Sequence, residues 1–160
     1  MRSPYLTLDK TPVQSSLVPL ASGTIELDPE LADALHDLDG FDYAWLLTWL
    51  GPRDGSSPPE VAMRLVPFFL KRQPREVGYL ATRSPRRLNP IGLSLIRILA
   101  VDPPNVNFAG VDVVDGTPVL DLKPYVTRFD RPRAEPRCGW FDSVALEDGA
   151  TPETLRPPGE

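Results

Sequence analysis

Two polar stretches rich in proline and glycine hold most of the side chains that could do chemistry in this sequence. The first runs from Gly78 to Leu95 (GYLATRSPRRLNPIGLSL) and sets arginines, a serine and an asparagine between apolar segments. Prolines restrict the backbone of such a loop, so its polar side chains are held in place rather than loosely displayed. A loop of this kind has little conformational entropy to lose on binding, which makes it a candidate binding site.

The second stretch, Gly110 to Asp130 (GVDVVDGTPVLDLKPYVTRFD), places Asp112, Asp115 and Asp121 around a DGTP turn. Carboxylates in or beside valine-rich strands need partners. A ligand could supply these partners, but so could the scaffold, through an Asx-turn at Asp115 and an ion pair between Lys123 and Asp121. The residues by themselves leave a binding site and a scaffold equally open.

The two stretches together resemble the signature of one protein family. The segments ATRSPRRLNPIGLS (Ala81–Ser94) and DVVDGTPVLDLKPY (Asp112–Tyr125) are similar, in order and spacing, to the paired motifs of the TsaA-like (TrmO) family. Pro12-Val13-Gln14 is a weaker match to the family's Pro-Arg-Gln, with valine in place of arginine. Leu88 is a second departure, because the family has a proline there.

This resemblance implies a small β-barrel that forms homodimers and binds S-adenosylmethionine in a cleft near the subunit boundary. It also implies a reaction, methylation of the exocyclic nitrogen of threonylcarbamoyl-adenosine beside the anticodon of tRNA. The expected cofactor-binding residues are Gln14, Arg83, Leu93, Asp112, Val113, Val114 and Asp115. The expected substrate-binding residues are Arg86, Arg87, Asn89 and Lys123.

The implied reaction needs a base, because the acceptor nitrogen is amide-like and a poor nucleophile until it loses a proton. No histidine matches a motif of the family. Asp115, Asp121 and Tyr125 are therefore the candidate catalytic residues.

The charge is unevenly distributed along the chain, although the net charge is −5. Residues 71–87 carry six basic side chains and one acidic side chain, whereas residues 26–42 carry seven acidic and no basic ones. Arg72, Arg75, Arg86 and Arg87 are candidate contacts to RNA phosphates. Two solvated surfaces of opposite charge would explain the pattern equally well.

Two other functions remain open at this point. The enzyme could use the same cofactor on a small molecule or on another nucleobase. Alternatively, the chain could be a non-catalytic module that binds S-adenosylmethionine. A family resemblance fixes a substrate less firmly than it fixes a fold.

Metal chemistry and membrane insertion find little support in the sequence. Cys138 is the only cysteine and His36 the only histidine, which argues against a zinc cluster, and we expect no metal. No stretch approaches the roughly 18 apolar residues of a membrane span, so we expect a cytoplasmic protein with no membrane contact.

The elements that must position these residues are short strands. The pattern predicts strands near residues 20–27, 44–50, 61–70, 78–82, 93–101, 105–111 and 118–122, with a helix from Asp28 to Gly40. The 20 prolines also disfavour long uninterrupted elements. The predicted fold is all-β and barrel-like with one or two short helices, and not a Rossmann fold because no glycine-rich strand-to-helix turn is present.

We predict one β-barrel domain over residues 1–145 and a disordered tail over residues 146–160, where no apolar period survives. The aromatic side chains of Trp45, Trp49, Phe68 and Phe69 could form a platform for base stacking. Their apolar neighbours favour the other interpretation, the core of the barrel.

Overall fold

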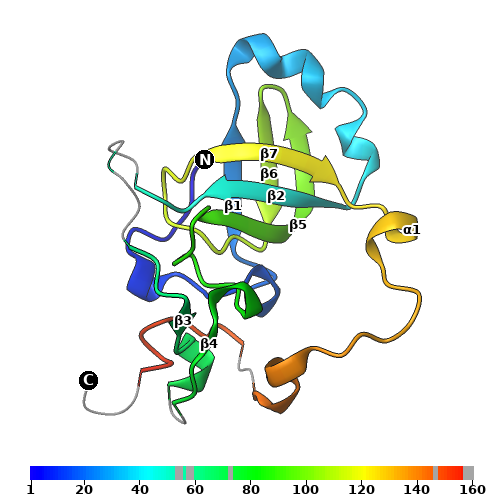
Figure 1. Cartoon of the computed structure of the whole chain (residues 1–160). Helices are drawn as coiled ribbons and strands as arrows, with labels where there is room; N and C mark the ends of the chain where they lie inside the picture. The colour runs from blue at the N-terminus through cyan, green and yellow to red at the C-terminus, as the bar shows by residue number, and fades with distance from the viewer. Residues whose placement is uncertain (53–55, 57–59, 72–73, 146–147, 157–160) are drawn as a thin grey trace.

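A computed structural model describes residues 1–52, 56, 60–71, 74–145 and 148–156 of the chain. Within them, five strands form one antiparallel sheet in the order β1-β6-β5-β2-β7 (Figure 1). Its strands are β1 (Ser22–Glu26), β2 (Tyr43–Trp49), β5 (Ile91–Asp102), β6 (Asn105–Ala109) and β7 (Val119–Pro124). Two short strands, β3 (Arg64–Leu65) and β4 (Val77–Gly78), form a separate ladder. The all-β prediction is confirmed, and no Rossmann-like arrangement is present in the described chain.

Strand β2 shows why the sheet forms, because its side chains alternate between two environments. Ala44, Leu46 and Thr48 are at most 1% exposed and point into the core. The residues between them point the other way and pair across to β5, with Trp45 opposite Leu95 and Leu47 opposite Leu93. This alternation follows from the two-residue period of a strand. We call the second side the outer face; it comprises Trp45, Leu47, Trp49, Ile91, Leu93 and Leu95.

The N-terminal residues connect the two edges of the sheet. The Arg2 amide donates to the Thr24 carbonyl oxygen on β1 (2.7 Å), and the Gly116 amide, just before β7, donates to the Met1 carbonyl oxygen (3.0 Å). Met1 and Tyr5 also pack against the core. In the described residues, β1 and β7 do not hydrogen-bond to each other, and only the N-terminal segment connects these two edges of the sheet. A closed barrel therefore stays a prediction.

The predicted helix from Asp28 to Gly40 is wrong in type and in continuity. Two 3-10 helices occupy this stretch, η3 (Pro29–Leu35) and η4 (Leu38–Gly40). The start was correctly placed, since the Asp28 carboxylate accepts a hydrogen bond from the Glu30 amide (3.1 Å). Asp37 adopts a left-handed conformation (φ 63°) and separates the two helices. Leu35 still reaches the core from this segment.

The strands predicted at residues 61–70 and 78–82 are also largely wrong. Only β3 and β4 are extended there, and each leads into a 3-10 helix, η5 (Phe68–Leu70) or η6 (Tyr79–Ala81). Pro67 prevents the first predicted strand from continuing to residue 70, because proline fixes φ and offers no amide donor. The other short helices are η1 (Leu8–Lys10), η2 (Ser15–Leu17), α1 (Thr127–Asp130) and η7 (Gly139–Ser143). None of the helices in the described residues is long and apolar enough to cross a membrane.

Residues 148–156 follow an irregular path along the N-terminal segment, within the stretch that the sequence predicts to be disordered. The Val13 amide donates to the Ala150 carbonyl oxygen (3.0 Å), and the Gly149 amide donates to the Leu17 carbonyl oxygen (2.8 Å). Arg156 pairs with Asp9 (2.6 Å). Residues 146–147 and 157–160 lie outside the described residues.

Candidate functional site

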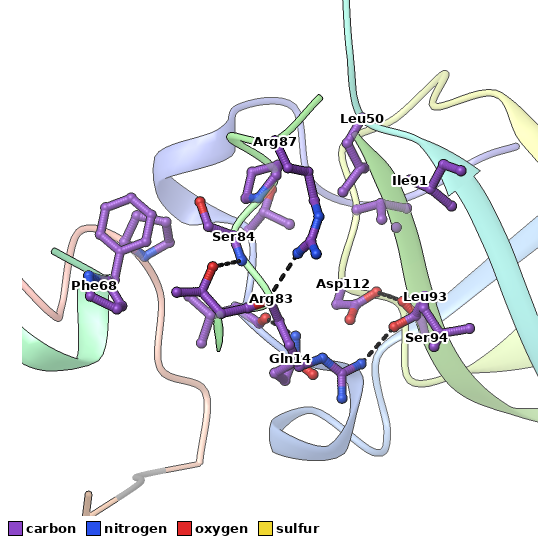
Figure 2. Close-up of a pocket in the computed structure, with 18 of the residues that line it drawn as sticks. Gln14, Leu50, Phe68, Arg83, Ser84, Arg87, Ile91, Leu93, Ser94 and Asp112 are labelled. Atoms are coloured by element: carbon purple, nitrogen blue, oxygen red, sulfur yellow. Dashed lines mark hydrogen bonds between the residues drawn. The ribbon is translucent and has the colours of Figure 1, made fainter. Parts of the chain in front are cut away.

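A cavity of about 1100 Å³ brings together the two polar stretches that the sequence singles out. The loop of residues 82–89, apart from Arg86, lines one part of it, and the first residues of β5 with residues 112–114 line another. Figure 2 shows Asp112, Leu93 and Ser94 close together, with Arg83 and Gln14 beside them. Residues that lie far apart in the sequence therefore share one site.

Hydrogen bonds between residues 79 and 87 fix the conformation of this loop. The buried Thr82 hydroxyl donates to the Tyr79 carbonyl oxygen (2.8 Å) and accepts from the Ser84 amide (3.2 Å). The Arg87 guanidinium donates to the Thr82 carbonyl oxygen (2.9 Å). These contacts support the prediction from composition that the backbone of this loop is rigid.

Arg83 links the loop to the sheet. Its guanidinium donates to the Leu93 carbonyl oxygen on β5 (2.8 Å), while its side chain remains exposed at the cavity. An arginine has five N–H donors, so this bond fixes its direction and leaves other donors for a ligand. Leu93 also lines the cavity and is 46% exposed.

Asp112 is held at the cavity by β5. The buried Ser94 hydroxyl donates to the Asp112 carboxylate (2.6 Å; Figure 2). Burial raises the pKa of the Asp112 carboxyl, and hydrogen bonds from Ser94 and from the Ser15 amide, with the charge of Arg83, offset part of this rise. Among the described residues that line the cavity, Asp112 is the only carboxylate. It therefore provides the negative charge that the site offers to a ligand.

Gln14 enters the cavity wall from the N-terminal segment. Pro12, Val13 and Gln14 all line the cavity, and the Gln14 side-chain amide donates to the Val13 carbonyl oxygen (2.6 Å). Of the seven expected cofactor-binding residues, all except Asp115 line the cavity (Gln14, Arg83, Leu93, Asp112, Val113 and Val114).

Asp115 interacts with the N-terminal segment. Its carboxylate accepts a hydrogen bond from the Ser3 amide (2.9 Å), and its own amide donates to the Tyr5 carbonyl oxygen (2.7 Å). Its carboxylate thus fixes the N-terminal segment that joins β1 to β7, and it is not one of the residues that line the cavity.

The other two candidate bases lie at strand β7, also away from the cavity lining. Asp121 forms the predicted ion pair with Lys123 (2.7 Å), and this hydrogen bond lowers the pKa of the Asp121 carboxyl. The ring of Tyr125, just after β7, packs against Trp45, with 6.0 Å between centroids.

The expected substrate-binding residues are divided between two places. Arg87 and Asn89 line the cavity, while Arg86 is exposed on the same loop without lining it. Lys123 is exposed on β7. Of the additional arginines predicted to contact phosphates, Arg75 is exposed and Arg72 lies outside the described residues.

The prediction that four aromatic residues form the core is wrong, because none of Trp45, Trp49, Phe68 and Phe69 belongs to the buried core cluster. Trp45 and Trp49 lie on the outer face, and Trp49, Phe68 and Phe69 line the cavity. The positions of Trp45 and Trp49 could have been predicted from the two-residue period of a strand. This period puts both side chains on the side of β2 opposite Ala44, Leu46 and Thr48.

Trp140 and Phe141 are residues of the cavity wall that the sequence did not predict. They line the cavity, and the Trp140 indole donates to the Ala81 carbonyl oxygen at the start of the loop (2.8 Å). The signal is the aromatic Trp-Phe pair that follows the charged and proline-rich residues 131–138.

Comparisons with known proteins identify the family of this chain. Residues 1–131 match the family model described as the tRNA-methyltransferase O N-terminal domain. A Pyrococcus abyssi protein named a probable S-adenosyl-L-methionine-binding protein is 32% identical over 142 residues, covering 89% of this chain and 72% of that protein. The tRNA (adenine(37)-N6)-methyltransferase of Escherichia coli is 36% identical over 138 residues, covering 79% of this chain and 54% of that enzyme.

Solved structures of TrmO are also similar to this chain. The crystal structure of TrmO from Pseudomonas aeruginosa superposes with a TM-score of 0.66 at 33% identity, covering 87% of this chain and 58% of that one. The chain spans only 40% of the length of an Archaeoglobus fulgidus relative named a probable S-adenosyl-L-methionine-binding protein. The shared motifs, the shared fold and the match over residues 1–131 show that this chain belongs to the tRNA-methyltransferase O N-terminal domain family.

Proposed function

We propose that this chain is an S-adenosylmethionine-dependent methyltransferase whose acceptor is the exocyclic nitrogen of threonylcarbamoyl-adenosine, next to the anticodon of tRNA. The observation that carries the proposal is the joining of the two family motifs in one cavity, through the 2.6 Å bond between Ser94 and Asp112. The name of the Escherichia coli relative supports methylation of an adenine N6 in tRNA, and the solved TrmO structures support the same family.

The residues of the cavity fit the proposed cofactor. S-adenosylmethionine supplies an activated methyl group on a positively charged sulfur, and it also carries an ammonium, a carboxylate, a ribose and an adenine. Asp112 offers negative charge for the cationic groups, and Arg83 offers a guanidinium for the carboxylate. Gln14 offers an amide for the ribose hydroxyls, and Leu93 an apolar surface for the adenine.

The acceptor nitrogen must lose a proton as it is methylated, and Asp112 is the candidate base that we favour. It is the only carboxylate among the described residues of the cavity lining, and burial raises its pKa. A raised pKa makes a carboxylate a better proton acceptor. The other candidates, Asp115, Asp121 and Tyr125, do not line the cavity of their own protomer. Asp121 and Tyr125 would serve as the base only if β7 of one subunit approached the cavity of another.

A homodimer formed through the outer face would bring the two subunits together beside the cavity. Ile91 and Leu93 are each 46% exposed, and both belong to the outer face and to the cavity wall. An apolar sheet face of this kind, continuous with a binding site, is typical of subunit interfaces. We propose that the two outer faces pack together and that each cavity opens at their boundary.

Arginines near the cavity would hold the RNA. Arg83, Arg86 and Arg87 come from one loop, and Arg75 precedes it. Guanidinium groups in such a cluster suit phosphate oxygens. Asn89 lies at the cavity, where its amide could read a base, whereas Lys123 is paired with Asp121 on β7. Because tRNA is the proposed substrate, we infer a cytoplasmic location.

The purified protein tests this proposal in two measurements. Calorimetry with S-adenosylmethionine should show binding, and transfer of its labelled methyl group to tRNA that carries unmethylated threonylcarbamoyl-adenosine should follow. Nucleoside mass spectrometry would identify the product. Absence of cofactor binding would refute the proposal. Cofactor binding without transfer to any RNA would instead favour a small-molecule methyltransferase or a binding module.

A further inference from the structure

One part of the cavity is built from aromatic side chains that the proposed cofactor site does not use. We call it the aromatic wall, and its members are Phe68, Phe69, Tyr79, Trp140 and Phe141. The Trp140 and Phe141 rings are stacked, with centroids 3.8 Å apart, and Phe69 meets Phe141 edge-on at 5.6 Å. All five side chains are only half-buried, and none belongs to the core cluster.

The aromatic wall is attached directly to the loop that carries Arg83. The Trp140 indole donates to the Ala81 carbonyl oxygen (2.8 Å), and the Tyr79 carbonyl oxygen accepts from the Thr82 hydroxyl (2.8 Å). Both contacts lie one or two residues before Arg83. The wall therefore has a fixed position relative to the residues proposed to hold the cofactor and the RNA.

Cationic side chains accompany these rings. The Lys71 ammonium lies 5.0 Å from the centroid of the Phe68 ring, and the half-buried Arg87 lines the same cavity. Aromatic rings that bases can stack on, set among cations that attract phosphates, are the combination by which proteins bind single-stranded nucleic acids. An apolar small-molecule site would not require these cations.

The size of the cavity leaves room for this second ligand. Its volume of about 1100 Å³ lies just above the range of roughly 300–1,000 Å³ that is usual for a site holding one small ligand. Figure 2 shows Phe68 on the opposite side of the Arg83–Arg87 loop from Asp112 and Leu93. A cofactor near Asp112 would leave the aromatic wall free.

We propose that the aromatic wall is a stacking site for an unpaired nucleobase of the RNA substrate. The proposal rests on the proposed function, because it assigns part of the same cavity to the acceptor RNA. Phe68 is the ring best suited to accept the base, since its described ring contacts include Lys71 and no other aromatic side chain. Trp140 and Phe141 position the wall.

The test is binding of a fluorescent anticodon stem–loop RNA, measured by anisotropy. Phe68→Ala should raise the Kd about 5- to 150-fold, which is the usual effect of losing one stacked base. Phe68→Trp should restore binding, because it keeps an aromatic face. Phe129→Ala is the matched control: its ring is 80% exposed on α1, outside the cavity lining, and its removal should leave the Kd unchanged.

Abasic nucleotides identify the stacked base. One abasic position in the loop of the RNA should weaken binding to the unmodified protein and have little further effect on Phe68→Ala. Such non-additivity is the mark of a direct contact. Equal RNA binding by Phe68→Ala and the unmodified protein, or additive effects at every position, would overturn the proposal, as would failure of the unmodified protein to bind the stem–loop.

Calorimetry with S-adenosylmethionine separates this inference from the proposed function. The Phe68→Ala variant should bind the cofactor within about twofold of the unmodified protein. If the unmodified protein binds RNA through Phe68 but takes up no cofactor, the proposed methyltransferase fails and the stacking site stands. If Phe68→Ala loses cofactor and RNA together, the stacking site is overturned.

Discussion

At the scale of single residues, Asp112 combines a charge at the candidate site with a cost to folding. Burial raises the pKa of its carboxyl, so the folded protein holds the proton more tightly than the unfolded chain does. The charged form therefore destabilises the fold at pH values above the raised pKa. This cost disappears when the pH falls below the carboxyl's usual value of 3.8. A residue kept charged at such a site is expected to serve binding or catalysis.

We therefore predict opposite effects of Asp112→Asn on stability and on binding. Asparagine has nearly the same shape and carries no charge, so the variant should have a higher Tm than the unmodified protein at pH 7. This difference should shrink towards zero near pH 4, and cofactor affinity should fall at least tenfold, as expected when an ion pair loses one partner. Thermal denaturation over a pH series and calorimetry measure the two effects.

Asp121→Asn is the control for this pair of measurements. Its pKa is lowered by the hydrogen bond to Lys123, so its charge stabilises the fold above the usual carboxyl pKa, and that stability is lost as pH falls through the lowered pKa. The Tm of this variant should therefore fall slightly or stay the same at pH 7, with cofactor affinity unchanged. A Tm of Asp112→Asn below that of the unmodified protein at pH 7 would contradict the assignment.

Gly92 shows how closely β2 and β5 approach each other. A Cβ at this position would collide with the Thr48 hydroxyl, which is fully buried and has no hydrogen-bond partner in the described structure. We predict that Gly92→Ala lowers the free energy of unfolding by about 1–3 kcal/mol, the usual cost of overpacking. Urea denaturation measures it. The same substitution in a Thr48→Ala background should cost less, and an equal cost in both backgrounds would show that the strain lies elsewhere.

At the scale of elements, the sequence predicts strands well where apolar and polar side chains alternate. It predicts them poorly where prolines and short turns determine the path of the backbone. The strand predictions overlap β1, β2, β5, β6 and β7. Alternation between buried and exposed side chains is clearest in β2 and in the first half of β5. The predicted helix at residues 28–40 failed because its apolar spacing suits an α-helix, yet Asp37 adopts a positive φ that no spacing reveals.

The candidate site was predictable to a similar extent. Motif resemblance led to six candidate cofactor-binding residues that the structure brings to one cavity. It could not show that the carboxylate of Asp115 would bond to the Ser3 amide, because that contact joins residues 112 positions apart. Nor could it place Trp140 beside Ala81, since no local pattern encodes a contact between distant segments.

The C-terminal segment gives a prediction at this scale. A chain ending at residue 145 should lose the hydrogen bonds of Ala150 to Val13 and of Gly149 to Leu17, along with the burial of Ala150. We expect its Tm to fall by a few degrees, since each lost backbone bond is worth about 1 kcal/mol. Hydrogen exchange at the Val13 amide should accelerate. An unchanged Tm and exchange rate would support the disordered tail that composition predicts.

At the scale of the whole molecule, a negatively charged protein is proposed to bind a polyanion. The net charge is −5, so binding must depend on the local arginines and not on the total. If Arg75, Arg86 and Arg87 each neutralise one phosphate, the logarithm of the RNA affinity should fall with that of salt concentration with a slope of about −2. RNA affinity should then drop about 15-fold between 50 and 200 mM salt.

Cofactor affinity is the internal control for this titration, because a compact zwitterionic ligand releases few counterions and should bind almost equally at both salt concentrations. Arg86→Gln should reduce the slope for RNA by about 0.7, the contribution of one phosphate contact to a single strand. A slope near zero in the unmodified protein would rule out phosphate contacts as the basis of RNA binding.

The outer face leads to the last prediction, because an apolar sheet face beside the cavity should bind a second copy of the chain. A symmetric pair would bring Leu47 and its neighbours of one subunit against the same face of the other. Leu47→Lys adds a charge that Asp121, its cross-strand neighbour on β7, can balance within one chain. Two such lysines buried in one interface would be costly.

Sedimentation should therefore show a dimer for the unmodified protein and a monomer for Leu47→Lys. Leu20→Lys is the control, because Leu20 is 87% exposed outside the outer face and its variant should remain dimeric. Because Ile91 and Leu93 belong to both the outer face and the cavity wall, the monomer should also bind S-adenosylmethionine more weakly. A monomeric unmodified protein with full cofactor affinity would show that each cavity is complete within one chain, and Asp112 would then be the only carboxylate base that the described cavity lining offers.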